Sequence, residues 1–331
     1  MRTARLTGAA IAIALGGCAS ATPVEPGAHS GDGVAIAKDT LLFTGAFEPG
    51  RQPDGNSVVI AAPDGLIVFD TGRHREHTQR LLDHAGVMHK PVVAIINSHW
   101  HLDHSSGNRM LREAWPDAQV YASDAAAGAL AGFLADSRRQ AQDLIARNAI
   151  AEPQLSDVRG DMETIAEGRS LLPTVAITSA GERSIAGRRL QVGLAGHAVT
   201  AADVWLYDPA TRVLLAGDLV TLPVPLLDTA CTAGWSDALH GLEAIGFERL
   251  VPGHGGTMDR AGFARYRKAF DGLLACAASD ASVDACSDRW LADAGDLVGD
   301  DQQALARSLL GYYLPQVLRA PAERRQRDCP A

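Results

Sequence analysis

Residues 98–108, SHWHLDHSSGN, place three histidines and an aspartate within six consecutive positions. These four residues are His99, His101, Asp103 and His104. They directly follow PVVAIIN (91–97), a β-branched run that predicts a fully buried strand. Imidazole nitrogens and carboxylate oxygens are ligands that zinc accepts. His99 and His101 would project to the same side of an extended backbone. The pattern therefore predicts a metal-binding loop at the end of a buried strand, rather than a solvated turn.

The overall composition is that of a globular protein with a sizeable hydrophobic core. Of its 331 residues, 47% are apolar and 21% are charged. This length suffices for one large domain with extensions, or for two domains. The formal net charge of −9 predicts an acidic surface that repels phosphate backbones. Nucleic acid is therefore not an expected partner.

The N-terminal residues have the three parts of an export signal. Arg2 and Arg5 supply positive charge, residues 6–15 are apolar, and small residues follow. The apolar stretch is too short to span a bilayer. The ending LGGC resembles a bacterial lipobox, in which Cys18 would be lipidated after cleavage; the alternative is ordinary cleavage near residues 19–21. We expect export from a bacterial cytoplasm to the periplasm, with lipidated Cys18 attaching the protein to a membrane surface.

The cysteines beyond the leader are even in number, which suits an oxidising compartment. They are Cys231, Cys276, Cys286 and Cys329. A bond between Cys276 and Cys286 would join two helices across a loop, and Cys231 with Cys329 would then tie the tail to the body. The sequence leaves all three pairings open. None of the four lies in a CxxC motif, so zinc binding by thiolates is not expected.

The order of expected elements is typical of sheets covered by helices, an α/β layered architecture. Residues 56–72 predict a β-hairpin around the turn Pro63-Asp64-Gly65. A helix is expected over 75–86, ending at Gly86. The Ala-rich block 124–172 is expected to be a helical insert between two strand-containing halves. Strands return over 184–255, and 260–320 is mostly helical.

Further motifs downstream suggest a relationship to a known family. HWHLDH resembles the defining motif of the metallo-β-lactamase fold superfamily, and the family's other motifs follow in order. GLAGHAVTAADVW contains His197, VLLAGDLV contains Asp218, LVPGHGG contains His254, and the upstream IVFDTG contains Asp70. The resemblance spans about residues 40–260. It implies a four-layer αββα sandwich with its metals at one sheet edge, a helical insert and C-terminal helices.

The expected organisation of the chain combines this resemblance with the composition. It comprises an export signal (1–18), a flexible tether rich in Ala, Pro, Gly and Ser (19–38), a metallo-β-lactamase-like domain (39–260) with the insert at 124–172, and a C-terminal helical extension (261–331).

The resemblance also implies a ligand set for two metal ions. His99, His101 and His197 would hold the first zinc; Asp103, His104 and His254 would hold the second; and Asp218 would bridge them. Asp70 would support the ligands from behind. Two Zn²⁺ are expected, with iron or manganese as the alternative metals. Adjacent cations lower the pKa of a shared water to about 7, and the resulting bridging hydroxide would attack the substrate, oriented by Asp103.

The function expected from these features is that of an exported dinuclear zinc hydrolase. Its partner would be a small-molecule substrate with an ester, lactone, thioester or amide bond. The alternatives are a mononuclear iron dioxygenase of sulfur compounds, a true zinc β-lactamase, and a non-catalytic binding module. Asp218 favours the broader hydrolase branches, because zinc β-lactamases usually carry Cys or Ser there. His101 argues against di-iron members that reduce oxygen. The oligomeric state is not predicted.

Several neighbouring residues have two interpretations. Trp100 and Leu102 would either flank the pocket or pack beneath it. Leu130, Phe133 and Leu134 of the insert would either form a pocket wall or cover the sheet. His74 and His77 are interpreted as a solvated helix start rather than a pocket lining.

Overall fold

The computed structural model describes residues 33–48, 50–322 and 329. The expected export signal, Cys18 and most of the expected tether lie outside the described residues. Within the described part of the chain, no helix has the length and apolar character needed to cross a membrane.

The first half of the chain builds a seven-stranded sheet whose strands lie in sequence order. The strands are β1 (Val34–Ala37), β2 (Thr40–Phe43), β3 (Ser57–Ala62), β4 (Gly65–Phe69), β5 (Val92–Ile96), β6 (Gln119–Ala122) and β7 (Val175–Ala176). β3 and β4 form the hairpin that the sequence predicts. β4, β5 and β6 run parallel. Their carboxyl ends therefore share one sheet edge, where Asp70 and the histidine loop follow.

The second half builds a five-stranded sheet with the order β12-β11-β10-β9-β8. The strands are β8 (Gly181–Ile185), β9 (Arg188–Gly196), β10 (Ala202–Asp208), β11 (Val213–Thr221) and β12 (Arg249–His254). β11 is buried along its whole length and pairs in parallel with β12. This places Asp218 in β11 beside His254 at the end of β12.

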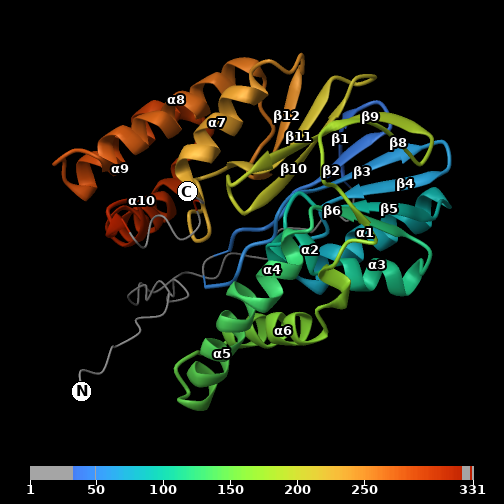
Figure 1. Cartoon of the computed structure of the whole chain (residues 1–331), viewed down its shortest axis with the longest axis horizontal. Helices are drawn as coiled ribbons and strands as arrows, with labels where there is room; N and C mark the ends of the chain where they lie inside the picture. The colour runs from blue at the N-terminus through green and yellow to red at the C-terminus, as the bar shows by residue number, and fades with distance from the viewer. Residues whose placement is uncertain (1–32, 49, 323–328, 330–331) are drawn as a thin grey trace.

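Apolar side chains between and outside the two sheets create four layers. One buried cluster, which includes Val58 and Ile67 of the first sheet and Val204 and Leu206 of the second, fills the space between the sheets. The outer face of the first sheet packs on α1 (Arg75–Met88) and α3 (Asn108–Ala114). The outer face of the second is covered by α7 (Thr232–Leu242) and α8 (Arg260–Ala277) (Figure 1). The predicted αββα sandwich is confirmed.

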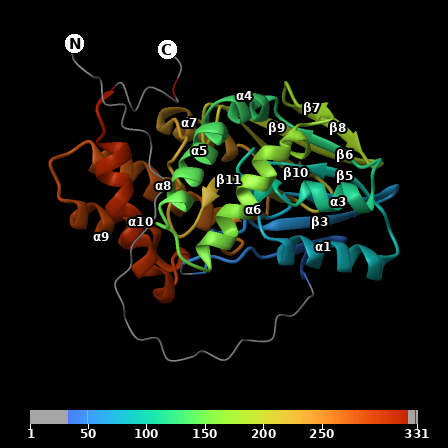
Figure 2. The same ribbon diagram turned by 90° about the horizontal axis from the view of Figure 1, so that it is seen from below.

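The remaining helices extend this sandwich. The C-terminal group comprises α9 (Val283–Ala294), α10 (Gln303–Tyr313) and the short turns Gly295–Leu297, Asp300–Gln302 and Leu314–Leu318. The insert comprises α4 (Ala125–Ala131), α5 (Phe133–Ala146), α6 (Gln154–Glu167) and the turn Arg169–Leu171. Figure 2 shows α5 and α6 running beside each other, across the end of the molecule that also carries α4.

The insert packs directly on the histidine loop. Trp100 and Leu102 are buried in one apolar cluster with Ala126 and Leu134 of the insert. Phe133 packs against the same cluster, with its ring centroid 5.5 Å from that of Trp100. Trp100 and Leu102 therefore pack beneath the insert, and the insert's apolar side chains brace the loop.

The four cysteines within the described residues form two disulfides. Cys276 of α8 is bonded to Cys286 of α9, and Cys231 is bonded to Cys329. Of the three pairings that the sequence leaves open, the structure has the one that joins two helices and ties the tail to the body.

Two element boundaries differ from the sequence expectation. β1 begins at Val34, inside the expected tether, because its backbone pairs with β2 in the register Val34↔Leu42. α1 continues past Gly86, whose cost in a helix is only about 1 kcal/mol relative to alanine. The helix ends instead at His89, whose left-handed backbone (φ 50°) directs its N–H to the carbonyls of Ala85 and Gly86.

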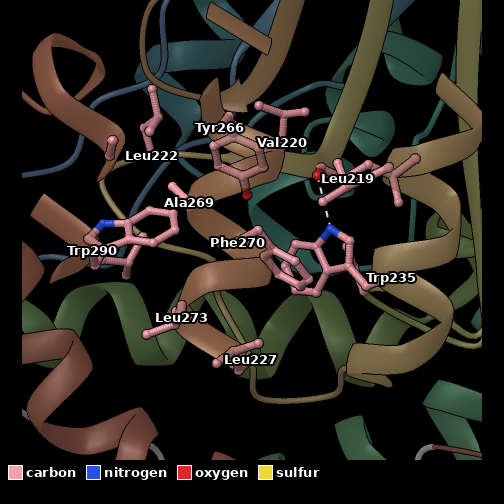
Figure 3. Packing of buried hydrophobic residues seen from close by; sticks show 14 of the residues in the cluster. Leu219, Val220, Leu222, Leu227, Trp235, Tyr266, Ala269, Phe270, Leu273 and Trp290 are labelled. Atoms are coloured by element: carbon pink, nitrogen blue, oxygen red, sulfur yellow. Dashed lines mark hydrogen bonds between the residues drawn. The ribbon is translucent and has the colours of Figure 1, made fainter. Parts of the chain in front are cut away.

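The largest core lies between the second sheet and the C-terminal helices and contains two buried tryptophans (Figure 3). The Trp235 ring is tilted against Phe270, with ring centroids 5.1 Å apart, and its Nε1–H donates to the carbonyl of Leu219 at 2.9 Å. Trp290 likewise donates to the carbonyl of Pro223 at 2.9 Å. Because each indole N–H has a carbonyl partner, both tryptophans can be buried in this core without an unpaired polar group.

Trp235→Ala is expected to lower the free energy of unfolding by about 3–5 kcal/mol, since it opens a cavity and leaves a buried carbonyl without its donor. Urea unfolding followed by circular dichroism measures this change. Val87→Ala, at a position 76% exposed, is the control and should change the value by less than about 0.5 kcal/mol. Equal effects of the two substitutions would contradict this description of the core.

Candidate metal centre

Five of the seven predicted ligands bring their donor atoms together at the shared edge of the two sheets. One group contains His99, His104 and Asp218, and the other contains Asp103, His104 and His254. Within each group, the donor atoms lie within 4.8 Å of one another, and all the residues are buried. The histidine loop brings three of these residues, β11 brings Asp218 and β12 brings His254. Residues far apart in sequence thus form one cluster.

Asp218 lies between the two groups and turns one oxygen toward each. Its Oδ2 is 3.9 Å from Nε2 of His99. Its Oδ1 is 3.2 Å from Nε2 of His104 and 3.6 Å from Nε2 of His254. Asp103 Oδ2 is 3.0 Å from the same His254 nitrogen. This is the placement that a carboxylate bridging two ions requires.

Five donor atoms of the cluster have no hydrogen-bond partner among the described residues. They are Nε2 of His99, His104 and His254 and both carboxylate oxygens of Asp218. A buried polar atom without a partner costs about 1–3 kcal/mol, and more when it is charged. Such atoms gathered around one point fit a bound cation, which would satisfy all of them at once. The residues therefore fit a bound divalent metal.

The charges of the cluster also favour a cation. Burial alone would lower the pKa of His104, but Asp218, Asp103 and Asp70 raise it well above 6.5. Burial alone would raise the pKa of Asp103, but His104, His254 and Arg73 hold it well below 3.8. In the metal-free chain, a proton on His104 supplies the positive charge that the carboxylates require. A metal ion would displace this proton.

Hydrogen bonds behind the loop direct the lone pairs of two histidines toward the cluster. The Ser98 hydroxyl donates to Oδ2 of Asp70 at 2.8 Å, so it must accept from Nδ1–H of His99 at 2.9 Å. Asp70 Oδ2 also accepts from Nδ1–H of His104 at 2.9 Å. In the neutral form of each ring, Nε2 is therefore the unprotonated nitrogen. Asp70 contacts the ligands without joining the cluster, as a supporting residue does.

His101 is oriented by a different partner. The Thr229 hydroxyl donates to the carbonyl of Val199 at 2.9 Å and therefore accepts from Nε2–H of His101, also at 2.9 Å. Burial lowers the pKa of His101 to about 4, so the ring is neutral at physiological pH. Nδ1 then carries the free lone pair. The His101 ring lies beside that of His99, with centroids 4.4 Å apart, although His101 is in neither donor group.

His197 lies farther from these groups. It follows β9 with a left-handed backbone (φ 51°), its side chain is exposed, and it belongs to neither donor group. Its N–H bonds the carbonyl of Ala201 at 3.0 Å. The segment is nevertheless tied to the centre, because Val199, two residues on, shares Thr229 with His101. The role of His197 as a ligand stays a prediction from sequence.

Two glycines and one asparagine make room for the cluster and join the sheets around it. A Cβ at Gly253 would lie 1.9 Å from Asp218 Oδ1, and one at Gly55 would lie 2.4 Å from the His104 ring. Asn56 receives a hydrogen bond from Gly45 and donates its N–H to the Gly253 carbonyl at 2.7 Å. Its side-chain amide also donates to the carbonyl of Pro252 at 3.0 Å. The end of β12 is thereby fixed beside the first sheet.

The interpretation of His74 and His77 as a solvated helix start is wrong. His77 is 3% exposed, and its Nε2 lies 2.8 Å from the hydroxyl of Ser57. His74 pairs through Nδ1 with Asp54 at 2.7 Å. Both belong to a buried polar network next to the metal cluster. Sequence reasoning missed this network, because its members come from separate segments.

The comparisons with known proteins agree with this geometry. A family model of the Metallo-beta-lactamase superfamily matches residues 50–267. The chain belongs to this superfamily, whose members are generally hydrolases. Each predicted ligand and Asp70 lies within the matched region.

Individual relatives are distant. A linear primary-alkylsulfatase of a Pseudomonas species is 25% identical over 218 residues, which span 60% of this chain and 40% of that protein. Among solved structures, a metallo-beta-lactamase from Pontibacter korlensis has a TM-score of 0.52 and 20% identity, covering 72% of this chain and 98% of its own. The DIM-1 metallo-beta-lactamase has a TM-score of 0.50 and 16% identity, with 72% and 95% covered. At these identities, the structures establish the shared fold alone.

Thr229→Val is expected to weaken metal binding at the centre by about tenfold or more, because the His101 ring loses the acceptor that fixes its tautomer. Competition with a chromophoric chelator measures this affinity. Thr229→Ser keeps the hydroxyl and should bind like the unaltered protein. Unchanged affinity in the valine variant would contradict the role assigned to Thr229.

Proposed function

We propose that the protein is an exported dinuclear zinc hydrolase that acts on a small substrate with an ester, lactone, thioester or amide bond. One observation carries the proposal: buried nitrogen and carboxylate donors converge in two groups that share His104, and Asp218 of the first group also lies 3.6 Å from His254 of the second. Membership of a superfamily of hydrolases supports it.

The chemistry follows from the donor set. Zinc ions held in such a site lower the pKa of water to about 7 and polarise the bond to be cleaved. The residues of the chain supply orientation. Asp103 turns Oδ2 into the cluster, 3.6 Å from Nε2 of His104, where it would orient the attacking water. Ser98, Asp70 and Thr229 fix the ligand rings in place. The burial of the cluster limits competing water, which strengthens electrostatic interactions.

Two features bear on the choice between this function and the alternatives. A mononuclear iron dioxygenase would use only one of the two donor groups, so the second group favours a dinuclear centre. Asp218, which offers one oxygen to each group, occupies the position where zinc β-lactamases usually carry Cys or Ser. The likeness to the solved metallo-beta-lactamases carries the fold and gives no argument for their substrate. The relative that is an alkylsulfatase adds sulfate esters to the substrates to be tested.

Export is supported by the sequence pattern of the leader and by the two disulfides, which form in oxidising compartments. A periplasmic location with a lipid on Cys18 is part of the proposal. Mass spectrometry of the membrane fraction would detect the lipid on the N-terminal cysteine.

Metal content tests the number of ions and the role of His197. We expect the purified protein to bind about two zinc ions per chain, and His197→Ala to lose most of one, because the first ion would keep only two of its histidines. Elemental analysis after dialysis measures the ratio. His240→Ala, at a half-exposed histidine of α7, is the matched control. Full occupancy in both variants would remove His197 from the ligand set.

Turnover tests the reaction class. Zinc-loaded protein should hydrolyse at least one member of a panel of carboxylic esters, lactones, thioesters, β-lactams and alkyl sulfates. Asp103→Asn should lower kcat by about 100-fold or more, since it weakens a ligand that would also orient the attacking water. Two bound ions without hydrolysis of any member would contradict the proposed function. A single iron with oxygen consumption would favour the dioxygenase instead.

A further inference from the structure

The helical insert reaches the metal cluster through charged side chains as well as through its apolar contacts. α6 carries Asp157 and Asp161, four residues apart and therefore on the same face of the helix. Asp157 accepts from the guanidinium of Arg51 at 3.0 Å and from the backbone N–H of Gln52 at 3.1 Å. Asp161 instead pairs with Arg73. The two carboxylates thus dock the same helix on different partners.

Arg73 lies between the insert and a predicted metal ligand. Its Nη1 donates to Asp161 Oδ2 at 2.6 Å, and its Nη2 lies 3.6 Å from Asp103 Oδ1. Nε donates to the carbonyl of Pro53 at 3.1 Å, which fixes the plane of the guanidinium. The side chain is only 12% exposed. Arg73 therefore connects two carboxylates, one on the insert and one in the cluster.

Because Arg73 contacts Oδ1 of Asp103, the two oxygens of this carboxylate face different partners. Oδ2 faces the cluster, 3.0 Å from Nε2 of His254. Oδ1 faces Arg73. The carboxylate is thereby held with one oxygen directed at the metal position and the other at a fixed cation. Rotation of Asp103 would break the ion pair with Arg73.

The charge of Arg73 would by itself oppose metal binding. A cation in a buried site is repelled by a second cation a few ångströms away, and a carboxylate shared with a guanidinium is a weaker metal ligand. Asp161 supplies the compensating negative charge on the far side of Arg73. The Arg73–Asp161 pair, which carries no net charge, then orients Asp103 without competing with the metal ion for its carboxylate.

We propose that Asp161 is a positioning residue that, by neutralising Arg73, keeps Asp103 directed at the second metal ion and so sets the affinity of that site. The inference rests on the proposed dinuclear function. It makes the insert part of the metal centre rather than only a cover for the sheet.

The test measures zinc binding to the full chain and needs no substrate. The metal-free protein is titrated with Zn²⁺ in competition with a chromophoric chelator, which gives the affinities of the first and second ions. Asp161→Asn keeps the shape and one acceptor oxygen but removes the charge. We expect it to weaken the second ion by about tenfold or more and to change the first by less than about threefold.

Asp157→Asn is the matched control. It makes the same change one turn earlier on α6, at a carboxylate that docks the insert through Arg51. It should leave the affinity of the second ion within about threefold of the unaltered protein. Thermal unfolding of the metal-free variants shows whether each one folds. Equal losses of affinity in the two variants would overturn the proposal, since docking of the insert alone would then explain them.

A double variant separates charge from packing. Adding Arg73→Met to Asp161→Asn removes the uncompensated cation, so the second ion should bind more tightly than in Asp161→Asn alone. Binding that is weaker than in the single variant would overturn the proposal.

The proposed function and this inference fail in different ways. An unaltered protein that binds fewer than two ions would contradict both. Two ions bound in the unaltered protein and in Asp161→Asn with equal affinity would contradict the inference alone. Absence of turnover by a protein with two ions would contradict only the function.

Discussion

The structure depends on the burial of negative charge that the protein alone does not compensate. Asp103 and Asp218 lie among histidines whose lone pairs face the same space, and both carboxylates are almost completely buried. Such an arrangement is unfavourable unless a cation occupies it. The raised pKa of His104 shows the same demand, because a proton there is the substitute that the metal-free chain has at hand. The surrounding sheets, glycines and hydrogen bonds keep these carboxylates close together despite their mutual repulsion.

Much of the fold and of the cluster could be predicted from the sequence. The hairpin around Pro63-Asp64-Gly65 and the buried strand before His99 have strong local sequence patterns. Tertiary packing does not override them, and both elements form as predicted. The HxHxDH spacing indicated a metal loop, and the order of later motifs pointed to Asp218 and His254. These residues come together because the two sheets pack face to face, which brings the loop after β5 of the first sheet beside β11 and β12 of the second.

The parts that could not be predicted depend on contacts between distant segments. His74 and His77 looked like a solvated helix start, yet Asp54 and Ser57 bury them. The pairing of Asp161 with Arg73 had no signal in the sequence, because only the packed structure brings these two residues together. His197 has the expected motif, but its side chain is exposed and is in neither donor group, so its role as a ligand stays a prediction. Thr229 gave no local signal at all.

The division of the metal-binding atoms between the two sheets has a consequence for how the protein matures. The histidine loop belongs to the first sheet, and Asp218 and His254 belong to the second, with Asn56 fastening one to the other. Neither half holds a complete binding site, so ion uptake must follow late assembly instead of guiding early collapse. Such long-range assembly is characteristic of slow-folding topologies. A metal ion held by this cluster would thus be acquired wherever the chain completes its folding, and the metals available in that compartment would decide which one it carries.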